Sequence, residues 1–417
     1  MIMQSHSGSL EIFNTQKCFE LIDQGQRIYQ LTNQMLESFQ LTTLHTHIKQ
    51  VVDEYYNLGE VIGIHEIFGG YVNRSFAIFI SNSERYFLRK YKTGITEKEI
   101  MFEHSLIDFA LQNGFTYGAQ VVASKSGATF IQSLGEYYAI YQFLPGEDKY
   151  TWDNPTLNDE ECASAAEVLA IFHNATRNFN PGHLQRVEPK IMDFLPTRTD
   201  VFKGFAEMAS DRNKRHCCQG KFHRYYINKL DSILDCIKIN TIAPEVWKKM
   251  PLNPCHNDYH PGNLKFANNR VIAVFDFDWS KIDLRLFDLA LAMNYCCSSW
   301  DEQQEEGQQE RQQEGKQDGQ LLLNKCHIFL KTYQATLKRI GGGQGGQGGG
   351  LTPLTDLEHH YLPTMMAAAN LYLINWDVTA YYNGENLNDY EYLTYLRHNV
   401  RVMEWIEENK KQIKDLL

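Results

Sequence analysis

The residues best suited to chemistry lie in one short stretch, the tract HNDYHPGN at 256–263. Asp258 and Asn263 are five residues apart in it, and a short apolar segment further on leads into Asp276 and Asp278. A hard cation such as Mg²⁺ prefers oxygen ligands and keeps phosphate oxygens as co-ligands. A carboxylate that holds no metal can accept a proton from a hydroxyl nucleophile. The combination therefore indicates a magnesium site beside a catalytic carboxylate, although each residue alone also fits an ordinary turn or cap.

The composition limits the classes of protein that can carry such a site. The chain has 417 residues, which suggests two or three structural units of roughly 150 residues each. Its 40 basic and 51 acidic residues give a net charge of −11, which argues against a nucleic-acid partner. With 43% hydrophobic residues the chain can bury a sizeable core. No apolar run approaches the roughly 18 residues of a membrane span, so we expect no membrane partner.

The N-terminal residues and the cysteines favour a cytoplasmic protein. The segment MIMQSHSGSLEIF has no basic region followed by an apolar stretch, so it predicts no secretory signal. The nine cysteines include adjacent pairs rather than the C-x-x-C spacing of zinc and redox sites. An odd count without a signal favours reduced thiols. We therefore expect thiols without chemistry in the cytoplasm.

The order of strand and helix patterns predicts an α+β chain in three parts. Residues 1–50 are expected to form a helical extension, and residues 51–143 a domain of antiparallel strands with one helix. Residues 144–417 are mostly helical, with a Gln-rich insertion at 301–320 and a Gly-rich tract at 341–350. The glycine tract lacks a preceding strand and a following Lys-Ser/Thr. It is therefore interpreted as a flexible linker rather than a phosphate loop.

Strands and one helix are predicted in the first of these domains. The expected strands are 60–68, 71–80, 86–91, 118–123, 128–132 and 137–143. Residues 96–99 fit a capping box that opens a helix ending near residue 113. Glu103 shares the apolar face of that helix, where a carboxylate is costly unless a cation meets it. Arg89 and Lys90, on the preceding strand, are the nearest cations in the sequence.

The motif His256-x-Asp258-x-x-x-x-Asn263 followed by Asp276 resembles the signature of a kinase superfamily. This superfamily contains the aminoglycoside phosphotransferases, choline kinases and type II homoserine kinases. The tract HPGN and the later FDLA at 287–290 strengthen the resemblance. Together with DFDW they look closest to homoserine-kinase-like enzymes. The resemblance implies a two-lobed protein-kinase-like fold, with an antiparallel sheet and a helix in one lobe and mainly helices in the other.

The resemblance, which covers about residues 55–300, also implies a role for each polar residue of the motif. Asp258 would be the base that orients and deprotonates the acceptor hydroxyl. Asn263 and Asp276 would be ligands of a Mg²⁺ ion that bridges the β- and γ-phosphates of ATP. Asp278 would be either a second carboxylate at the metal or a residue that holds the backbone of the loop.

Two further residues are expected to support the catalytic loop. By the same resemblance, His256 is expected to be structural rather than a proton carrier. Asp288, in the FDLA tract, would brace the loop through hydrogen bonds, although a helix-capping aspartate would look the same in the sequence.

The nucleotide side is also assigned by resemblance. A strand cation that contacts the phosphates and pairs with a helix carboxylate would be Arg89, in place of lysine, with Glu103. Lys90 points to the opposite strand face. A turn that covers the nucleotide is expected at Gly69, Gly70 and Asn73. It departs from G-x-G-x-x-G, so an ordinary hairpin turn remains an alternative. Adenine would meet backbone groups of a hinge that consists of Gln142, Phe143 and Leu144.

The sequence thus predicts an enzyme that moves the γ-phosphate of ATP, with Mg²⁺, to a hydroxyl of a small molecule. The acceptor would be an amino alcohol, a hydroxy amino acid such as homoserine, or a sugar or aminoglycoside. The alternatives are a Ser/Thr protein kinase of the same fold, a nucleotide-binding pseudokinase or regulatory module, and a magnesium-dependent hydrolase. Trp279, Tyr381 and Tyr382 are candidates for contact with the acceptor, although aromatic residues in such helices more often belong to the core.

Overall fold

In the computed structural model of the chain, the described residues are 43–67, 73–151, 157–184, 186–208, 220–300, 318–341, 350–384 and 388–416. The expectations for residues 1–42 and for most of the two low-complexity tracts fall outside this set. The chain divides into two compact units. Unit 1 runs to Tyr91 and takes in Ala123–Ala139, whereas unit 2 consists of Lys92–Val122 and the residues from Ile140 onward.

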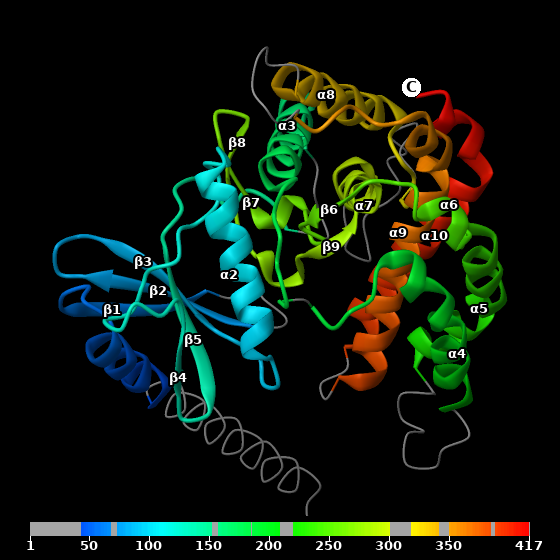
Figure 1. Cartoon of the computed structure of the whole chain (residues 1–417). Helices are drawn as coiled ribbons and strands as arrows, with labels where there is room; N and C mark the ends of the chain where they lie inside the picture. The colour runs from blue at the N-terminus through cyan, green and yellow to red at the C-terminus, as the bar shows by residue number, and fades with distance from the viewer. Residues whose placement is uncertain are drawn as a thin grey trace, which may run out of the picture. The chain divides into compact units, whose positions relative to one another are not determined.

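A five-stranded sheet, in the order β1-β2-β3-β5-β4, provides the strands of unit 1 (Figure 1). Its strands are β1 (Val61–Ile67), β2 (Arg74–Ile80), β3 (Arg85–Lys90), β4 (Ile131–Ser133) and β5 (Glu136–Gln142), the end of which belongs to unit 2. The pairs β1–β2, β2–β3 and β4–β5 are antiparallel. Residues 43–55 are helical and pack on this sheet, because the ring of His45 contacts that of Phe76 and the ring of His47 that of Tyr138.

Four of the six predicted strands are confirmed with small shifts of their ends, and two are not. Residues 118–123 form only isolated bridges, from Gly118 to Val274 and from Val121 to Tyr141. Of the strand expected at 128–132, only the last residues lie in β4. The reason is a tight turn between the two segments, in which the Ser124 hydroxyl accepts the Ala128 N–H at 3.1 Å. The turn takes up residues 124–128, so the first residue of the predicted strand 128–132 belongs to it.

Unit 2 is mainly helical. Its helices are α2 (Glu97–Gln112), α3 (Asp159–Thr176), α4 (Ile191–Glu207), α5 (Lys221–Asn240), α6 (Pro244–Trp247), α7 (Arg285–Cys297), α8 (Leu323–Gly341), α9 (Asp356–Asn383) and α10 (Asp389–Lys414). The capping box predicted for α2 is present, and α3 begins with a second one at Asn158. Helix α9 packs against both α7 and α10, and α3 lies along α8 (Figure 1). Among the described residues, no helix is long and apolar enough to cross a membrane.

Two small antiparallel ladders hold the motif residues in unit 2. Strand β6 (Leu252–Cys255) pairs with β9 (Lys281–Leu284), and β7 (Leu264–Ala267) pairs with β8 (Arg270–Val274). The 3₁₀ turns η2 (Pro261–Asn263) and η3 (Phe277–Trp279) end the two loops that carry the acidic residues. The helix α2, which carries Glu103, packs against η3, the turn that follows Asp276.

Candidate active site

Asp258 lies at the centre of the loop between β6 and β7. Its carboxylate Oδ2 accepts a hydrogen bond from Asn263 Nδ2 at 3.0 Å and faces His260 Nε2 at 3.6 Å. The Gly262 N–H donates to His260 Nδ1, so a neutral His260 ring carries its proton on Nε2, toward Asp258. Burial raises the pKa of Asp258, but His260, His256 and the Asn263 amide together outweigh it. The net effect lowers the pKa, so Asp258 is a carboxylate at neutral pH.

Asn263 and Asp276 lie on neighbouring strand ends. Leu264 pairs with Val274, and the N–H of Phe275 donates to the carbonyl of Asn263 at 3.1 Å. The side-chain nitrogen of Asn263 is engaged by Asp258, which leaves its amide oxygen for a metal. Asp276 has left-handed backbone angles, φ 64° and ψ 62°, at the start of η3. This donor set consists of oxygens only and suits a hard divalent cation.

Asp278 lies within η3, two residues after Asp276, and its side chain is 5% exposed. The left-handed turn at Asp276 bends the chain sharply between the two carboxylates. Both alternatives for Asp278, a second metal ligand and a residue that holds the loop, therefore remain predictions.

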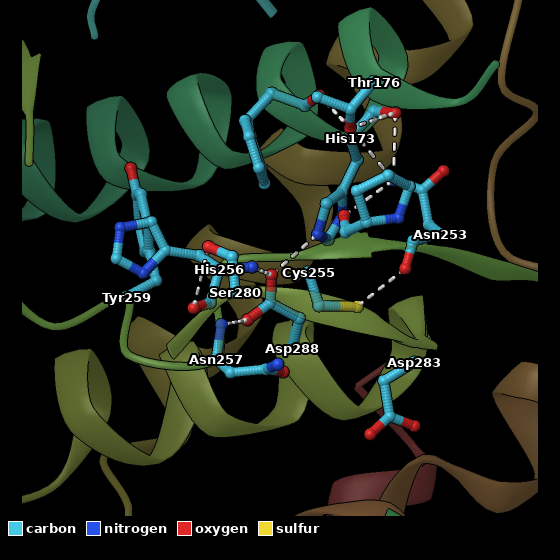
Figure 2. A network of polar contacts seen from close by, with 12 residues as sticks. His173, Thr176, Asn253, Cys255, His256, Asn257, Tyr259, Ser280, Asp283 and Asp288 are labelled. Carbon is cyan, nitrogen blue, oxygen red and sulfur yellow. Dashed lines mark hydrogen bonds and ion pairs between the residues drawn. The ribbon is translucent and has the colours of Figure 1, made fainter. Parts of the chain in front are cut away.

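A buried network braces the loop that carries Asp258 (Figure 2). The two carboxylate oxygens of Asp288 accept the backbone N–H groups of His256 at 2.7 Å and Asn257 at 2.8 Å. His173 Nε2 contacts Asp288 at 2.9 Å, and His173 Nδ1 contacts the Tyr333 hydroxyl at 2.7 Å. Burial alone would raise the pKa of Asp288. The hydrogen bond and charge of His173, together with His256, outweigh this effect, so the pKa is lowered. The bracing role expected of Asp288 is confirmed.

His173 was missed by the sequence reasoning. It lies on α3, a helix with many buried apolar residues, and its side chain is 0% exposed. A histidine on such a helix must find partners for both ring nitrogens, and this requirement was the available signal. His256 is structural as expected: its Nε2 contacts the Phe275 carbonyl at 3.1 Å, and burial lowers its pKa.

The predicted hinge residues lie close to β7, the strand that pairs with β8. The backbone N–H of Gln142 donates to the Gln120 carbonyl at 2.9 Å. Lys265 Nζ lies 5.6 Å from the ring centroid of Phe143 and 5.8 Å from that of Phe275, the residue before Asp276. Just beyond Leu144, the chain forms a bridge to β7. The hinge segment and the candidate metal ligands are therefore neighbours within unit 2.

The remaining nucleotide-side predictions divide between the two units. Arg89 lies on β3 in unit 1 and is 4% exposed, whereas Glu103 lies on α2 in unit 2 and is 3% exposed. Glu103 is buried on the apolar helix face as predicted, and it accepts a hydrogen bond from the Tyr141 hydroxyl at 3.2 Å. The pairing of Arg89 with Glu103 stays a prediction. Lys90 forms an ion pair with Glu136 at 3.1 Å.

The residues of the predicted nucleotide-covering turn are only partly described. Asn73, immediately before β2, is 8% exposed. Gly69 and Gly70 lie outside the described residues. The covering role of this turn therefore stays a prediction as well.

Several charged side chains lie near Trp279, whose carbonyl contacts the loop that carries Asp258. Asn257 Nδ2 donates to the carbonyl of Trp279 at 3.1 Å, and the Arg186 guanidinium lies 4.9 Å from the ring centroid of Trp279. Glu188 accepts hydrogen bonds from Lys281 at 2.8 Å and from the Tyr372 hydroxyl at 3.1 Å. Both signs of charge therefore lie close to Asp258.

Two of the three aromatic candidates for acceptor contact belong to the core. Tyr381 and Tyr382 are 1% and 7% exposed, and Tyr381 stacks on Phe222 with ring centroids 3.8 Å apart. The suggestion that they contact the acceptor is therefore not supported. Trp279 differs, because it is half-buried and lies beneath Arg186 beside the catalytic loop.

Comparison with known proteins identifies the class. Residues 63–322 match the model of the phosphotransferase enzyme family, and the chain belongs to this family. It is 23% identical over 251 residues to a homoserine kinase of Granulibacter bethesdensis, covering 59% of this chain and 68% of that one. It is 25% identical over 252 residues to a homoserine kinase of Caulobacter vibrioides, covering 60% and 70%.

Solved structures show the same fold at low identity. An aminoglycoside phosphotransferase from Alicyclobacillus acidocaldarius is 15% identical, with a TM-score of 0.57 over 88% of this chain and 96% of that one. A spectinomycin phosphotransferase, in complex with ADP and spectinomycin, is 14% identical, with a TM-score of 0.59 over 87% and 98%. A choline kinase from Cryptosporidium parvum is 15% identical, with a TM-score of 0.53 over 89% and 98%. The predicted α+β, protein-kinase-like fold is confirmed.

Family and fold together define an ATP-dependent phosphotransferase that acts on a hydroxyl of a small molecule. This class favours a transferase over the pseudokinase and hydrolase alternatives. It also favours a small-molecule kinase over a protein kinase.

Proposed function

We propose that this enzyme transfers the γ-phosphoryl group of Mg·ATP to the hydroxyl of a small hydroxy amino acid of the homoserine type, with Asp258 as the base. The geometry of Asp258 is the observation that carries the proposal. Its carboxylate is ionised and held by the Asn263 amide at 3.0 Å, in a loop fixed by Asp288. An amino alcohol is the second choice.

In the proposed reaction, Asp258 accepts the hydrogen bond of the acceptor hydroxyl and so orients its oxygen. The bond from that oxygen to the γ-phosphorus forms as the bond from the β–γ bridging oxygen breaks. The hydroxyl proton passes to Asp258, and ADP leaves. Because the transition state is loose, most of the catalysis comes from positioning and charge stabilisation rather than from proton removal.

The metal ligands would be the amide oxygen of Asn263 and the carboxylate of Asp276, with Asp278 as a possible third. A bound Mg²⁺ would neutralise the charge of the β- and γ-phosphates. Asn263 would serve two functions at once, since its nitrogen orients the base while its oxygen faces the cation. This arrangement would fix the base relative to the phosphate under attack.

The nucleotide would be held by the remaining predicted residues. Backbone groups of Gln142, Phe143 and Leu144 would receive adenine. Arg89, oriented by Glu103, would contact the phosphates, and the turn containing Gly69, Gly70 and Asn73 would cover them. Arg89 and Glu103 are both buried, and a buried charge is costly without a polar partner.

The choice of a homoserine-type acceptor rests on the relatives and on the charges near the loop. The two curated relatives cited above are homoserine kinases. Arg186, Lys281 and Glu188 provide both signs of charge beside the loop that carries Asp258. A zwitterionic acceptor uses both signs, whereas a neutral sugar uses neither.

The test is a screen of the full-length protein with Mg·ATP against homoserine, amino alcohols and sugars. ADP release is measured together with ³¹P NMR of the phosphorylated product. We expect one new phosphomonoester signal with a hydroxy amino acid and none with Asp258→Asn. ATP consumption without any phosphorylated acceptor would overturn the proposed transfer.

A further inference from the structure

Arg186 is a cation beside the catalytic loop without an acidic partner among the described residues. Its guanidinium lies 4.9 Å from the Trp279 ring centroid, and its Nε is buried without a hydrogen-bond partner. The carbonyl of Trp279 receives the side chain of Asn257, the residue before Asp258. An arginine stacked on an aromatic ring keeps its planar N–H groups free for a carboxylate. Arg186 therefore presents an anion-binding group next to the proposed base.

Asp377 on α9 presents the opposite charge. It is 0% exposed, its Oδ2 accepts the Asn399 side-chain nitrogen at 2.7 Å, and its Oδ1 has no hydrogen-bond partner among the described residues. A buried carboxylate that has one oxygen without a hydrogen-bond partner is costly, unless a cation binds that oxygen or the group is protonated. Burial does raise the pKa of Asp377 well above its ordinary value. Asp377 is thus either a protonated, structural carboxyl group or a carboxylate that binds a cation.

Two tyrosine hydroxyls connect these side chains with the base. The Tyr295 ring lies 5.2 Å from that of His260, and burial, together with the nearby charges of Asp258 and Asp377, raises the pKa of its hydroxyl well above the usual range. The Tyr372 hydroxyl donates to Glu188. Burial and the charges of Glu188 and Asp258 raise its pKa, whereas the charge of Arg186 lowers it. All of these residues belong to unit 2, and α9 packs against α7, which carries Tyr295. Arg186 therefore lies near Tyr372 and Asp377 near Tyr295, and both tyrosines lie close to Asp258.

Glu188 is the other acid of this region, but it is already paired. Lys281 contacts it at 2.8 Å and the Tyr372 hydroxyl at 3.1 Å, and Lys281 also contacts Asp283 at 3.2 Å. Binding of an ammonium group by Glu188 would compete with these partners. Among the described residues, Oδ1 of Asp377 has no such competitor.

We propose that Arg186 binds the carboxylate and Asp377 the ammonium of a zwitterionic acceptor, whose hydroxyl is thereby presented to Asp258. This inference rests on the proposed function and adds the two residues that select the substrate. It predicts that removing either charge from the substrate harms only the matching contact.

The experiment compares three acceptors that differ in one charged group. Homoserine carries both groups, 3-aminopropan-1-ol lacks the carboxylate, and 4-hydroxybutanoate lacks the ammonium. kcat and KM are measured for wild type, Arg186→Gln, Asp377→Asn and the control Arg270→Gln, whose side chain is 61% exposed in a surface ion pair.

We expect Arg186→Gln to raise KM for homoserine and 4-hydroxybutanoate by about 10- to 100-fold, the range for a lost charge-assisted hydrogen bond. Its KM for 3-aminopropan-1-ol should stay within about twofold. Asp377→Asn should show the mirror pattern and spare only 4-hydroxybutanoate. Arg270→Gln should match wild type with all three acceptors.

Equal losses with all three acceptors would overturn the inference, because they indicate a structural role. An unchanged Asp377→Asn would show a neutral structural acid and overturn the ammonium contact. A wild-type enzyme that phosphorylates a sugar but none of the three acceptors would overturn the inference and leave phosphoryl transfer by Asp258 standing. Absence of any phosphorylated product would instead defeat the proposed function.

If a variant does not fold, the wild-type enzyme provides a second measurement. 2-Aminobutanoate, propylamine and butanoate lack the hydroxyl and can act only as inhibitors. With a phosphorylatable acceptor held at its KM, 2-aminobutanoate should inhibit at least about tenfold more strongly than the other two. Equal inhibition by all three compounds would overturn the zwitterion site.

Discussion

The catalytic loop and the acceptor side of the same unit are specified in different ways. In the loop, Asp258, Asn263 and Asp276 lie within 19 residues of one another in the sequence and are joined by local hydrogen bonds. On the acceptor side, Arg186, Trp279 and Asp377 come from a connection, a 3₁₀ turn and a long helix. If the proposed roles hold, the chemistry is concentrated in one segment, whereas substrate choice is spread over segments that can change independently.

The two regions also differ in how their polar groups are satisfied. Both carboxylate oxygens of the buried Asp288 are engaged, by two backbone N–H groups and by His173. Asp377 is equally buried but has one oxygen without a partner among the described residues. A fully satisfied network holds one geometry, and an incomplete one has capacity for a ligand.

The largest effect is expected at Asp258. Asp258→Asn removes the proton acceptor but keeps the shape of the side chain, so kcat should fall by about 10² or more. Binding of Mg·ATP should stay within a few-fold of wild type. Single-turnover kinetics and nucleotide titration measure the two quantities. A variant with near-normal kcat on a confirmed acceptor would remove Asp258 from its role and erase the contrast between the two regions.

The extent to which the sequence predicted the molecule follows the same division. The motif, the capping box at Thr96 and the burial of Glu103 are local patterns, and the structure contains them. Arg186 and Asp377 carry no local signal, because only tertiary packing brings them near the loop. Tyr381 and Tyr382 were suggested by residue type alone and proved to be core, since large aromatic rings are most often buried.

The second prediction tests how firmly the loop is braced. Asp288→Ala leaves two backbone N–H groups and His173 without their acceptor in a site with no solvent access. The free energy of unfolding should fall by about 3–5 kcal/mol, as for other broken buried pairs. Urea denaturation checks it, with Arg270→Ala as the control, for which the loss should stay below about 1 kcal/mol. Similar losses in the two variants would show that Asp288 is not a structural anchor.

A third prediction separates the two carboxylates of the acidic turn. Asp276→Ala should raise the Mg²⁺ concentration needed for half-maximal activity by about tenfold or more, since even groups that only support a ligand cost that much. Asp278→Ala should have a smaller effect on Mg²⁺ dependence. Activity is titrated with Mg²⁺ at fixed ATP in both variants. Equal effects, or the reverse order, would assign the primary metal contact to Asp278.

The smallest effects are expected where the two units each provide one residue. If Glu103 orients Arg89 toward the phosphates, Arg89→Ala and Glu103→Ala should each lower kcat/KM for ATP. The double variant should then cost little more than one single variant, because residues that act as a unit are not additive. Lys90→Ala should be mild, since Lys90 points to the other strand face and pairs with Glu136 at 3.1 Å. Steady-state kinetics of the four variants, with ATP varied, decide the question.

Additive losses, or a Lys90 defect larger than that of Arg89, would transfer the phosphate contact to Lys90. The nucleotide side would then resemble the acceptor side, in which neither sequence spacing nor residue type identifies the contact.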